Sequence, residues 1–367
     1  MIDRTTSKTL TGVAGVLYRY YQGLTAVIAI FLLTTTACAQ TTKITKPAEA
    51  SQQATSTAKT PTEPTTRIVV AKDGSGDYKY IQDAIDAVRA FTPVRITIYI
   101  RNGTYKEKVH IPAWVTDINL VGESPENTII TYDDHAGRGK MGTFDTYTLR
   151  IEGNNINVEN LTIRNTAGPV GQAVALHVEG DRLVFRNCRF LGDQDTIFAS
   201  GEGARQYYVD CYIEGTTDFI FGPATALFEN CQIHSKKDSY ITAASTPEWV
   251  RWGYVFKNCT FTAAPGVHEV YLGRPWRDYA KTVFINCTFG PHIRPEGWHN
   301  WSRPEAEKTS FYAEYNNRGP GAGTAKRVGW SHQLTAQQAA EYTAENIFSA
   351  HTDTKTGDNI WYRRQTP

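Results

Sequence analysis

The sequence predicts an all-β chain folded as a parallel β-helix, a solenoid in which each coil stacks on the one before it. A seven-residue motif occurs five times, and consecutive copies are spaced by 20 to 28 residues. The copies are rich in aromatic and β-branched residues and are flanked by Gly, Asn and Asp, which is typical of short strands separated by turns. Steps of this length are too long for hairpins and too short for a propeller blade of about 40 residues, but they fit one solenoid coil.

The motif reads apolar, apolar, any residue, Asn or Asp, Cys, any residue, apolar. Its copies are VFRNCRF, YYVDCYI, LFENCQI, VFKNCTF and VFINCTF, which place Cys at positions 188, 211, 231, 259 and 287. A weaker sixth copy at 156–163 puts Leu161 in the Cys place. Stacked in register, the Cys side chains form an interior column about 4.8 Å apart, too far for disulfides, so we expect free buried thiols. The Asn side chains form a ladder at a bend, which argues against glycosylation of the three Asn-x-Thr sequons in this column.

The ends of the chain predict export, a linker and two helices. Residues 1–39 resemble a signal peptide, since the apolar core at 24–33 is shorter than the roughly 20 residues of a membrane span. Cleavage at the Ala37/Ala39 site predicts a secreted or periplasmic protein, whereas lipidation of Cys38 would give an outer-membrane lipoprotein. Residues 40–66 have the composition of a flexible linker, so the folded domain is expected at 67–367.

Open coil ends need covering, because an exposed strand edge promotes aggregation. The apolar periodicity at 78–91 predicts a helix that caps the N-terminal end, with Asp77 as its N-cap. A second helix at 335–349 is expected to pack at the C-terminal end.

Composition excludes several functions. The chain has 38 Lys and Arg against 37 Asp and Glu, so it lacks the basic excess of a nucleic-acid-binding protein. It contains no GxSxG, HExxH or phosphate-loop motif, and its 9 His show no metal-ligand spacing. We therefore expect no cofactor and no metal.

Two carboxylates stand out because they share one position in the repeat. Asp195 and Asp218 each follow the Cys of their own copy by seven residues, so stacking in register brings them to the same side of neighbouring coils, about 5 Å apart. Two carboxyl groups at that distance do not ionise independently, and the pKa of one is raised. Such a pair supplies an ionised nucleophile or base beside a protonated acid. Asp193 is interpreted as a turn residue, and Asp238, at the same offset, as a solvated charge.

Four stretches resemble the signature motifs of the pectin methylesterase (pectinesterase) family, bacterial type: GQAVAL at 171–176, GDQDTIF at 192–198, GTTDFIFG at 215–222 and LGRPW at 272–276. Two later stretches, GWHNW and AEYNNRGPGA, are similar to its C-terminal motifs. The resemblance implies a right-handed parallel β-helix and a carboxylic ester hydrolase. Its substrate would be methylesterified pectin, from which it releases methanol and leaves pectate.

The resemblance also implies roles for individual residues. Asp218 matches the nucleophile that forms an acyl-enzyme, and Asp195 the general acid that then acts as a base. Gln172 and Gln194 match the amides that bind the oxyanion. Arg274 matches the residue that pairs with the nucleophile.

The remaining expected contacts are with the sugar. Trp276 matches an aromatic side chain that stacks on it, and Phe198 and Phe219 are expected to lie half in the core and half in the cleft wall. Thr143 and His177 complete the predicted substrate-binding set. His177 stands where the family usually has Arg, and Asp193 where it usually has an aromatic residue, so the preferred methylation pattern stays open.

Alternatives remain open from sequence. Related lipid-anchored proteins act on other acyl esters or acyl-CoA thioesters. Paired carboxyls about 5 Å apart also suit a retaining glycosidase acting on pectin. A calcium-dependent lyase would need several converging acids, and a non-catalytic carbohydrate-binding solenoid would need neither carboxylate. We expect a monomer that contacts the membrane only if Cys38 is lipidated.

Overall fold

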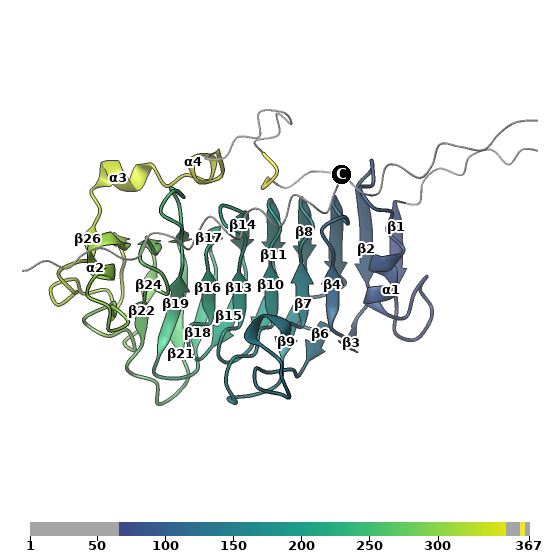
Figure 1. Cartoon of the computed structure of the whole chain (residues 1–367), viewed down its shortest axis with the longest axis horizontal. Coiled ribbons are helices and arrows are strands. Elements are labelled where there is room, and N and C mark those ends of the chain that lie inside the picture. Colours follow the sequence, from purple (N-terminus) through teal and green to yellow (C-terminus); the bar gives the residue numbers. More distant parts are fainter. Residues whose placement is uncertain (1–65, 350–359, 364–367) are drawn as a thin grey trace, which may run out of the picture. The chain divides into compact units, whose positions relative to one another are not determined.

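A computed structural model describes residues 66–349 and 360–363, which include the whole predicted coil region. The predicted signal peptide and all of the predicted linker except Thr66 lie outside the described residues. Within the described part the chain winds through three parallel sheets, here called A, B and C, and passes through them in that order in successive coils. Figure 1 shows their strands side by side along the coil axis. The predicted right-handed parallel β-helix is confirmed.

Sheet A runs β1 (Arg67–Val70), β2 (Ile96–Ile100), β5 (Ile118–Gly122), β8 (Ile156–Glu159), β11 (Leu183–Arg186), β14 (Arg205–Val209), β17 (Thr225–Glu229), β20 (Tyr254–Lys257), β23 (Lys281–Ile285), β25 (Phe311–Tyr315) and β26 (His332–Gln333). Sheet B comprises β3 (Gly103–Lys106), β6 (Thr128–Tyr132), β9 (Thr162–Asn165), β12 (Arg189–Leu191), β15 (Tyr212–Gly215), β18 (Gln232–Ser235), β21 (Thr260–Ala263) and β24 (Thr288–Phe289). Sheet C comprises β4 (Val109–Ile111), β7 (Leu149–Ile151), β10 (Leu176–Val178), β13 (Ile197–Ala199), β16 (Ile220–Gly222), β19 (Tyr240–Ala244) and β22 (Tyr271–Gly273).

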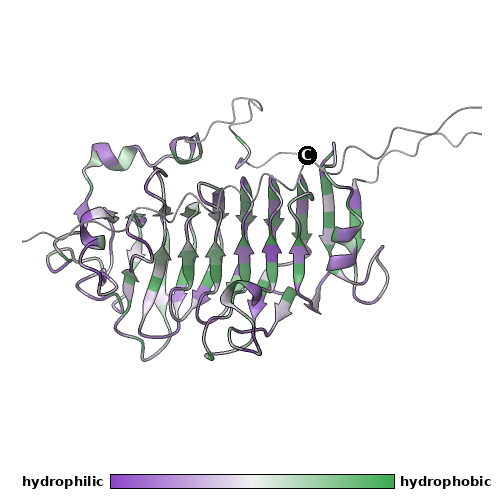
Figure 2. Cartoon of the chain, in the orientation of Figure 1, coloured by the Kyte–Doolittle hydropathy of each residue, from purple (hydrophilic) through white to green (hydrophobic). Residues whose placement is uncertain are grey.

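The repeat motif lies at the end of each sheet A strand and builds the core. Its aromatic position forms a stack with ring centroids 4.5 to 4.7 Å apart, made of Phe185, Tyr208, Phe228, Phe256 and Phe284. The five motif cysteines are buried free thiols, as predicted, and Leu161 is buried in the Cys place of the preceding coil. Apolar residues accordingly concentrate in the strands, whereas hydrophilic ones dominate the loops (Figure 2).

The motif's Asn or Asp residue bends the chain from sheet A into sheet B. Every copy adopts a left-handed conformation with φ between 51° and 55°, at Asn187, Asp210, Asn230, Asn258 and Asn286. Asn and Asp tolerate this conformation better than other residues with a Cβ. The structure therefore confirms the predicted bend, and side-chain hydrogen bonds join two neighbouring pairs of the column, Asn187 to Asn160 and Asn316 to Asn286. The bend explains why sequon-like triplets recur there.

The N-terminal helix is shorter than predicted, and its cap is different. α1 spans Ile81–Asp86 rather than 78–91, and Tyr80 is its N-cap without a side-chain hydrogen bond. The Glu107 carboxylate instead accepts hydrogen bonds from the first backbone amides of α1, including that of Ile81 at 3.0 Å. The Asp77 carboxylate accepts the backbone N–H of Val69 at 2.7 Å, so it covers the edge strand β1 rather than the helix.

The predicted C-terminal helix is two short helices that cover a side of the solenoid. α3 (Ala336–Ala340) begins with a capping box at Thr335, and α4 (Ala344–Ser349) follows it. Tyr342 and Phe348 pack in a second apolar cluster on the outer face of sheet A, and Phe348 lies 5.8 Å from the Tyr207 ring. The expectation that this segment packs at the end of the solenoid is therefore wrong.

The other short helices are α2 (Ala306–Thr309) and η1 (Thr143–Asp145). No helix of the described part is long and apolar enough to cross a membrane.

The bend residue Asn258 tests the ladder, since it is exposed and has φ of 55°. Replacing Asn258 by Ala should destabilise the protein by about 1 kcal/mol, because Ala is strained in this conformation. For a chain of this size that corresponds to a loss of about 2–4 °C in melting temperature. Asn258→Gly is the matched control and should cost less, since Gly adopts positive φ freely. Equal losses in both variants, measured by calorimetry, would contradict a backbone origin.

Candidate active site

The two in-register carboxylates lie at the start of neighbouring strands of sheet C. β13 and β16 pair as Ile197 with Ile220, and Asp195 and Asp218 each precede these residues by two positions. Both acids adopt left-handed backbone conformations, with φ of 65° for Asp195 and 48° for Asp218. Their equivalent places in the ladder confirm that both lie on the same side of adjacent coils.

Asp238 does not extend this pair, although it shares the offset from its Cys. β19 pairs with β16 so that Thr242 faces Ile220, and this register puts Tyr240 in the place next to Asp218. The coil has therefore gained two residues before β19. Asp238 lies in the preceding turn, where its carboxylate accepts the backbone N–H groups of His268 and Glu269.

Asp193 is half-buried and paired with Lys236, whose ammonium lies 3.1 Å from its carboxylate. Its backbone carbonyl accepts the N–H of Thr216 and the hydroxyl of Thr196. These contacts agree with a role in the turn. Because Lys236 offsets its charge, Asp193 is not an isolated extra anion beside the cleft.

A cleft of about 230 Å³ gathers seven of the ten predicted site residues. Its lining is Thr143, Phe144, Gln172, Gln194, Asp195, Asp218, Phe221, Ala243, Arg274, Trp276 and Trp301. The two glutamines come from neighbouring coils, joined by a parallel bridge in which the Ala173 N–H donates to the Gln194 carbonyl at 3.1 Å. The ladder thus brings two amides and two carboxyl groups to one opening.

Arg274 binds only one of the two acids. Its Nε and Nη2 donate to the two carboxylate oxygens of Asp218 at 2.9 and 2.6 Å. The guanidinium lies between two aromatic rings, 3.9 Å from the centroid of Tyr240 and 3.6 Å from that of Trp301. A planar guanidinium held on both faces and at one edge has little freedom to turn away from the carboxylate.

Sequence reasoning assigned no role to Tyr240 or Trp301. Trp301 ends the GWHNW stretch, which resembles a family motif, but that motif does not indicate the contact of Trp301 with the Arg274 guanidinium. The place of Tyr240 depends on the two residues gained before β19, which the repeat spacing alone does not locate. Phe144 and Ala243 are further cleft residues that the sequence did not indicate. Phe221, which the sequence places as an apolar neighbour of the two acids, also lines the cleft, as the alternation of inward and outward side chains along β16 allows.

The two carboxyl groups differ in their electrostatic surroundings. Burial raises the pKa of Asp195 well above its usual range, and the neighbouring Asp218 raises it further, against weaker opposing effects of Arg274 and Gln194. Burial also raises the pKa of Asp218, but the hydrogen bonds and charge of Arg274 oppose this rise. Of the two groups, the surroundings of Asp195 therefore favour the protonated form more strongly, and those of Asp218 favour the carboxylate more strongly.

Three predicted substrate contacts do not line the cleft. Phe219 is fully buried in the main core, so it cannot contact a sugar. Phe198 is buried behind the lining, stacked against Phe144 at 4.8 Å and Phe221 at 4.7 Å. His177 is also buried, and it contacts the cleft wall from behind.

The cleft combines a carboxyl group whose raised pKa favours its protonated form, a second carboxyl group paired with Arg274, and two amides. Such a set can supply a nucleophile, a proton donor and hydrogen-bond donors for a developing oxyanion. No cluster of three or more His, Cys, Asp or Glu side chains suited to a metal ion occurs among the described residues.

Comparison with known proteins relates the chain to one family. The pectinesterase family model matches residues 67–351. Pectinesterase 31 of Arabidopsis thaliana is 39% identical over 301 residues, which cover 79% of this chain and 94% of that protein. Pectinesterase 2 of Citrus sinensis is 40% identical over 306 residues, but this region is only 59% of its length.

Solved structures give the same result. The pectin methylesterase from carrot superposes with a TM-score of 0.73 at 33% identity, covering 76% of this chain and 92% of that one. Pectin methylesterase PemA from Erwinia chrysanthemi has a TM-score of 0.68 at 30% identity, covering 78% and 97%. A pectin methylesterase in complex with a hexasaccharide has a TM-score of 0.67 at 31% identity, with the same coverage. The similarity spans plant and bacterial proteins, so it does not single out a bacterial type. The chain belongs to the pectinesterase family of carboxylic ester hydrolases.

Proposed function

We propose that this pectinesterase removes methyl esters from the galacturonate units of pectin, with Asp218 as the nucleophile and Asp195 as the general acid and base. The observation that carries the proposal is the unequal pairing of the two stacked acids. Arg274 donates two hydrogen bonds to Asp218, while no arginine or lysine is bonded to Asp195 among the described residues.

The first half of the reaction forms an acyl-enzyme. An Asp218 carboxylate oxygen attacks the ester carbonyl carbon, and the carbonyl oxygen becomes an oxyanion held by the amides of Gln172 and Gln194. As the tetrahedral intermediate collapses, the bond to the methoxy oxygen breaks. Asp195 donates its proton to that oxygen, and methanol leaves. The products of this half are an anhydride between the galacturonate and Asp218, and an ionised Asp195.

The second half releases the acid. The Asp195 carboxylate takes a proton from water, whose oxygen attacks the galacturonyl carbon of the anhydride. Cleavage of the bond to the Asp218 oxygen regenerates its carboxylate beside Arg274, and Asp195 is again protonated. Each cycle therefore consumes one water and starts from the protonation state that the surroundings of the two acids favour.

The cleft lining suits a neutral ester attached to a polysaccharide. Phe144, Phe221, Ala243 and Trp276 offer apolar surface beside the acids, which favours a methyl ester over a free carboxylate. Trp276 is half-buried at the cleft and presents an aromatic ring of the kind that stacks on sugars. A structural relative described in complex with a hexasaccharide supports a polymeric substrate.

The glycosidase alternative explains fewer of these residues. Two carboxyl groups suffice for glycoside hydrolysis, so the two amides and the bidentate Arg274 would have no part in it. An assay on highly methylated pectin decides between the two. We expect methanol release at constant polymer length and no hydrolysis of an acyl-CoA. Shortened chains without methanol, or turnover of the acyl-CoA alone, would contradict the proposal.

Export is the location that fits an extracellular polysaccharide as substrate. The predicted signal peptide supports a secreted or periplasmic enzyme. The lipid anchor at Cys38 and the monomeric state stay predictions, and mass spectrometry and light scattering of the purified protein test them.

Replacing Asp218 by Asn should reduce methanol release by at least about a thousandfold, since an amide is not a nucleophile at this position. The fold should be retained, because Asn also tolerates the left-handed backbone. Asp238→Asn is the matched control: it removes an acid at the same repeat offset outside the cleft and should keep full activity. Retained turnover in Asp218→Asn would reassign the nucleophile.

Replacing Asp195 by Asn should lower kcat at least about a hundredfold, the lower range for loss of a general acid. In the wild type, activity should fall in acid as Asp218 gains a proton, and in alkali as Asp195 loses one.

The same Asp195→Asn variant should be more stable than the wild type in alkali. The pKa of Asp195 is raised by folding, so its favourable contribution is complete below the unfolded pKa and is lost as the pH rises through the folded pKa. The amide that replaces the carboxyl group does not titrate, so the melting temperature of the variant should exceed that of the wild type more at pH 9 than at pH 5. A constant difference across this range would show that Asp195 does not titrate in it.

Replacing Tyr240 by Leu should lower kcat about tenfold, because the guanidinium of Arg274 loses one aromatic face and its fixed orientation toward Asp218. Tyr271→Leu is the control. Tyr271 stacks on Tyr240 at 5.3 Å and contacts Arg294, and no contact of it with Arg274 is seen. Kinetics on methylated pectin should show less than about a twofold change in the control; equal losses would indicate a general packing defect.

A further inference from the structure

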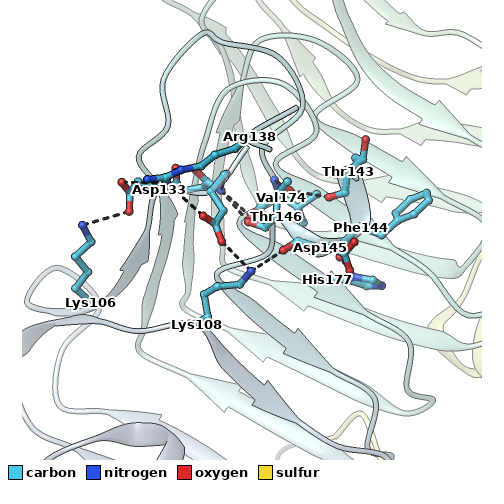
Figure 3. A network of polar contacts seen from close by, with 12 residues as sticks. Lys106, Lys108, Asp133, Arg138, Thr143, Phe144, Asp145, Thr146, Val174 and His177 are labelled. Atoms are coloured by element: carbon cyan, nitrogen blue, oxygen red, sulfur yellow. Dashed lines mark hydrogen bonds and ion pairs between the residues drawn. The ribbon is translucent and has the colours of Figure 1, made fainter. Parts of the chain in front are cut away.

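One wall of the cleft is a single helical turn fixed by side-chain donors. η1 contributes Thr143 and Phe144 to the cleft. Four successive backbone carbonyls, of residues 143 to 146, each accept a hydrogen bond from a side chain: the Thr146 hydroxyl at 2.7 Å, His177 at 3.2 Å, the Lys108 ammonium at 2.6 Å and the Asn165 amide at 3.1 Å. Figure 3 shows His177 and Lys108 reaching this turn from the sheet beneath it.

Both ring nitrogens of His177 face acceptors. Nδ1 lies 3.2 Å from the carbonyl oxygen of Phe144, and Nε2 lies 2.7 Å from a carboxylate oxygen of Glu179. The hydrogen bond from His177 holds the pKa of Glu179 below its usual range, and the Ser200 hydroxyl, which donates to the other oxygen at 3.0 Å, adds to this effect. Neither partner atom carries a hydrogen, so both contacts are satisfied only by a doubly protonated ring.

The other groups around His177 do not replace this proton. Arg150 lies beside His177 in the adjacent strand β7 and pairs with Glu152 at 2.7 Å. The Lys108 ammonium lies 4.7 Å from the centroid of the Tyr147 ring, and that ring meets His177 edge-on. From β13, the neighbour in register is the apolar Phe198.

Imidazole differs from the other three donors to η1. The hydroxyl and the amide do not titrate in the ordinary range, and an ammonium group ordinarily loses its proton only near pH 10. Histidine is the side chain that most often changes charge between about pH 5 and 8. Of the four links to this turn, the one from His177 is the only one whose donor is an imidazole.

We propose that His177 is a positioning residue whose doubly protonated ring ties η1, and with it the cleft wall at Thr143 and Phe144, to strand β10, so that substrate binds less tightly once the ring loses a proton. A neutral ring keeps one N–H and must give up either Phe144 or Glu179. The shorter contact is to the carboxylate, so the carbonyl of Phe144 is the one released.

Release of this carbonyl affects binding rather than chemistry. Phe144 stacks on Phe198, which in turn stacks on Phe221 in the cleft. A loosened η1 therefore disturbs the apolar wall that receives the ester. Asp195, Asp218 and Arg274 are held by other contacts, so KM should rise while kcat changes little.

This inference rests on the proposed esterase activity, and kinetics on methylated pectin between pH 5.5 and 8.5 test it. In the wild type we expect KM to rise by about tenfold over this range, the value of one hydrogen bond to a charged group. His177→Arg keeps the charge at all these pH values and should show a flat KM, whereas His177→Gln should have a high KM throughout. If KM in His177→Arg rose between pH 5.5 and 8.5 by the same factor as in the wild type, the proposal would be overturned.

The matched control is His110→Gln. His110 lies two strands away in the same row of sheet C and pairs with Glu152, and no hydrogen bond joins it to η1 in the described part of the chain. It should keep the wild-type pH dependence of KM. If His110→Gln lost that pH dependence, the effect would come from the charges of the in-register residues His110, Arg150 and His177, not from the hydrogen bond between His177 and Phe144.

A readout independent of activity keeps the test valid if a His177 variant folds poorly. Nitrogen NMR of the wild-type protein should show both ring nitrogens of His177 protonated at pH 5.5, with one lost on raising the pH together with faster amide exchange in residues 143–146. A neutral ring at pH 5.5 would refute the inference whatever the kinetics. Absence of methanol release in the wild type, with the NMR result as expected, would refute the proposed function alone.

Discussion

The register between successive parallel coils is the constraint on which the whole structure depends. Ring centroids 4.5 to 4.7 Å apart in the aromatic stack show that each coil repeats the placement of the last within the spacing of paired strands. A slip of one residue would turn every inward side chain outward, so the buried column fixes the register against a large loss of apolar contact. The same register carries Asp195 and Asp218 to one side. The catalytic spacing is therefore a consequence of core packing and needs no separate device.

The site residues destabilise the fold locally, and the pairing of neighbouring coils compensates for that cost. Both acids are buried and have raised pKa values, and both occupy left-handed backbone conformations. Buried carboxyl groups of this kind cost folding free energy, and they persist because neighbouring coils hold the ladder on both sides. Arg274 offsets the cost at one acid only. In the proposed mechanism that asymmetry separates a proton donor from a nucleophile, whereas equal pairing of both acids would leave two carboxylates and no donor.

Periodic features were predictable from sequence, and features that break the period were not. The Cys and Asn columns fixed the coil, the bend and the in-register acids, because each depends only on equal spacing. Tyr240 was missed since the coil before β19 gains two residues, which moves Asp238 out of register. Phe219 was misplaced because strand alternation would put it on the same face as Phe221, whereas it precedes β16 directly after the left-handed turn at Asp218 and packs in the core beside Ile220. The C-terminal helices were placed wrongly, since nothing in an amphipathic pattern says which of several apolar surfaces it will cover.

The cleft is built from two kinds of segment, paired strands and connecting loops, and the loops tolerate substitution more readily than the strands. Strand starts in sheet C supply Asp195 and Asp218 and cannot move without breaking the ladder. The connecting segments supply the walls, with Phe144 from η1 on one side and Trp301 from a loop after β24 on the other. Such insertions leave the strand pairing intact, so their side chains can be exchanged without altering the distance between the acids. His177 links the two kinds: it belongs to β10 by its backbone and to η1 by its side chain. Under the proposal made for His177, a change of charge at that one ring alters the cleft wall while Asp195 and Asp218 stay in place, so substrate binding is controlled separately from the chemical steps.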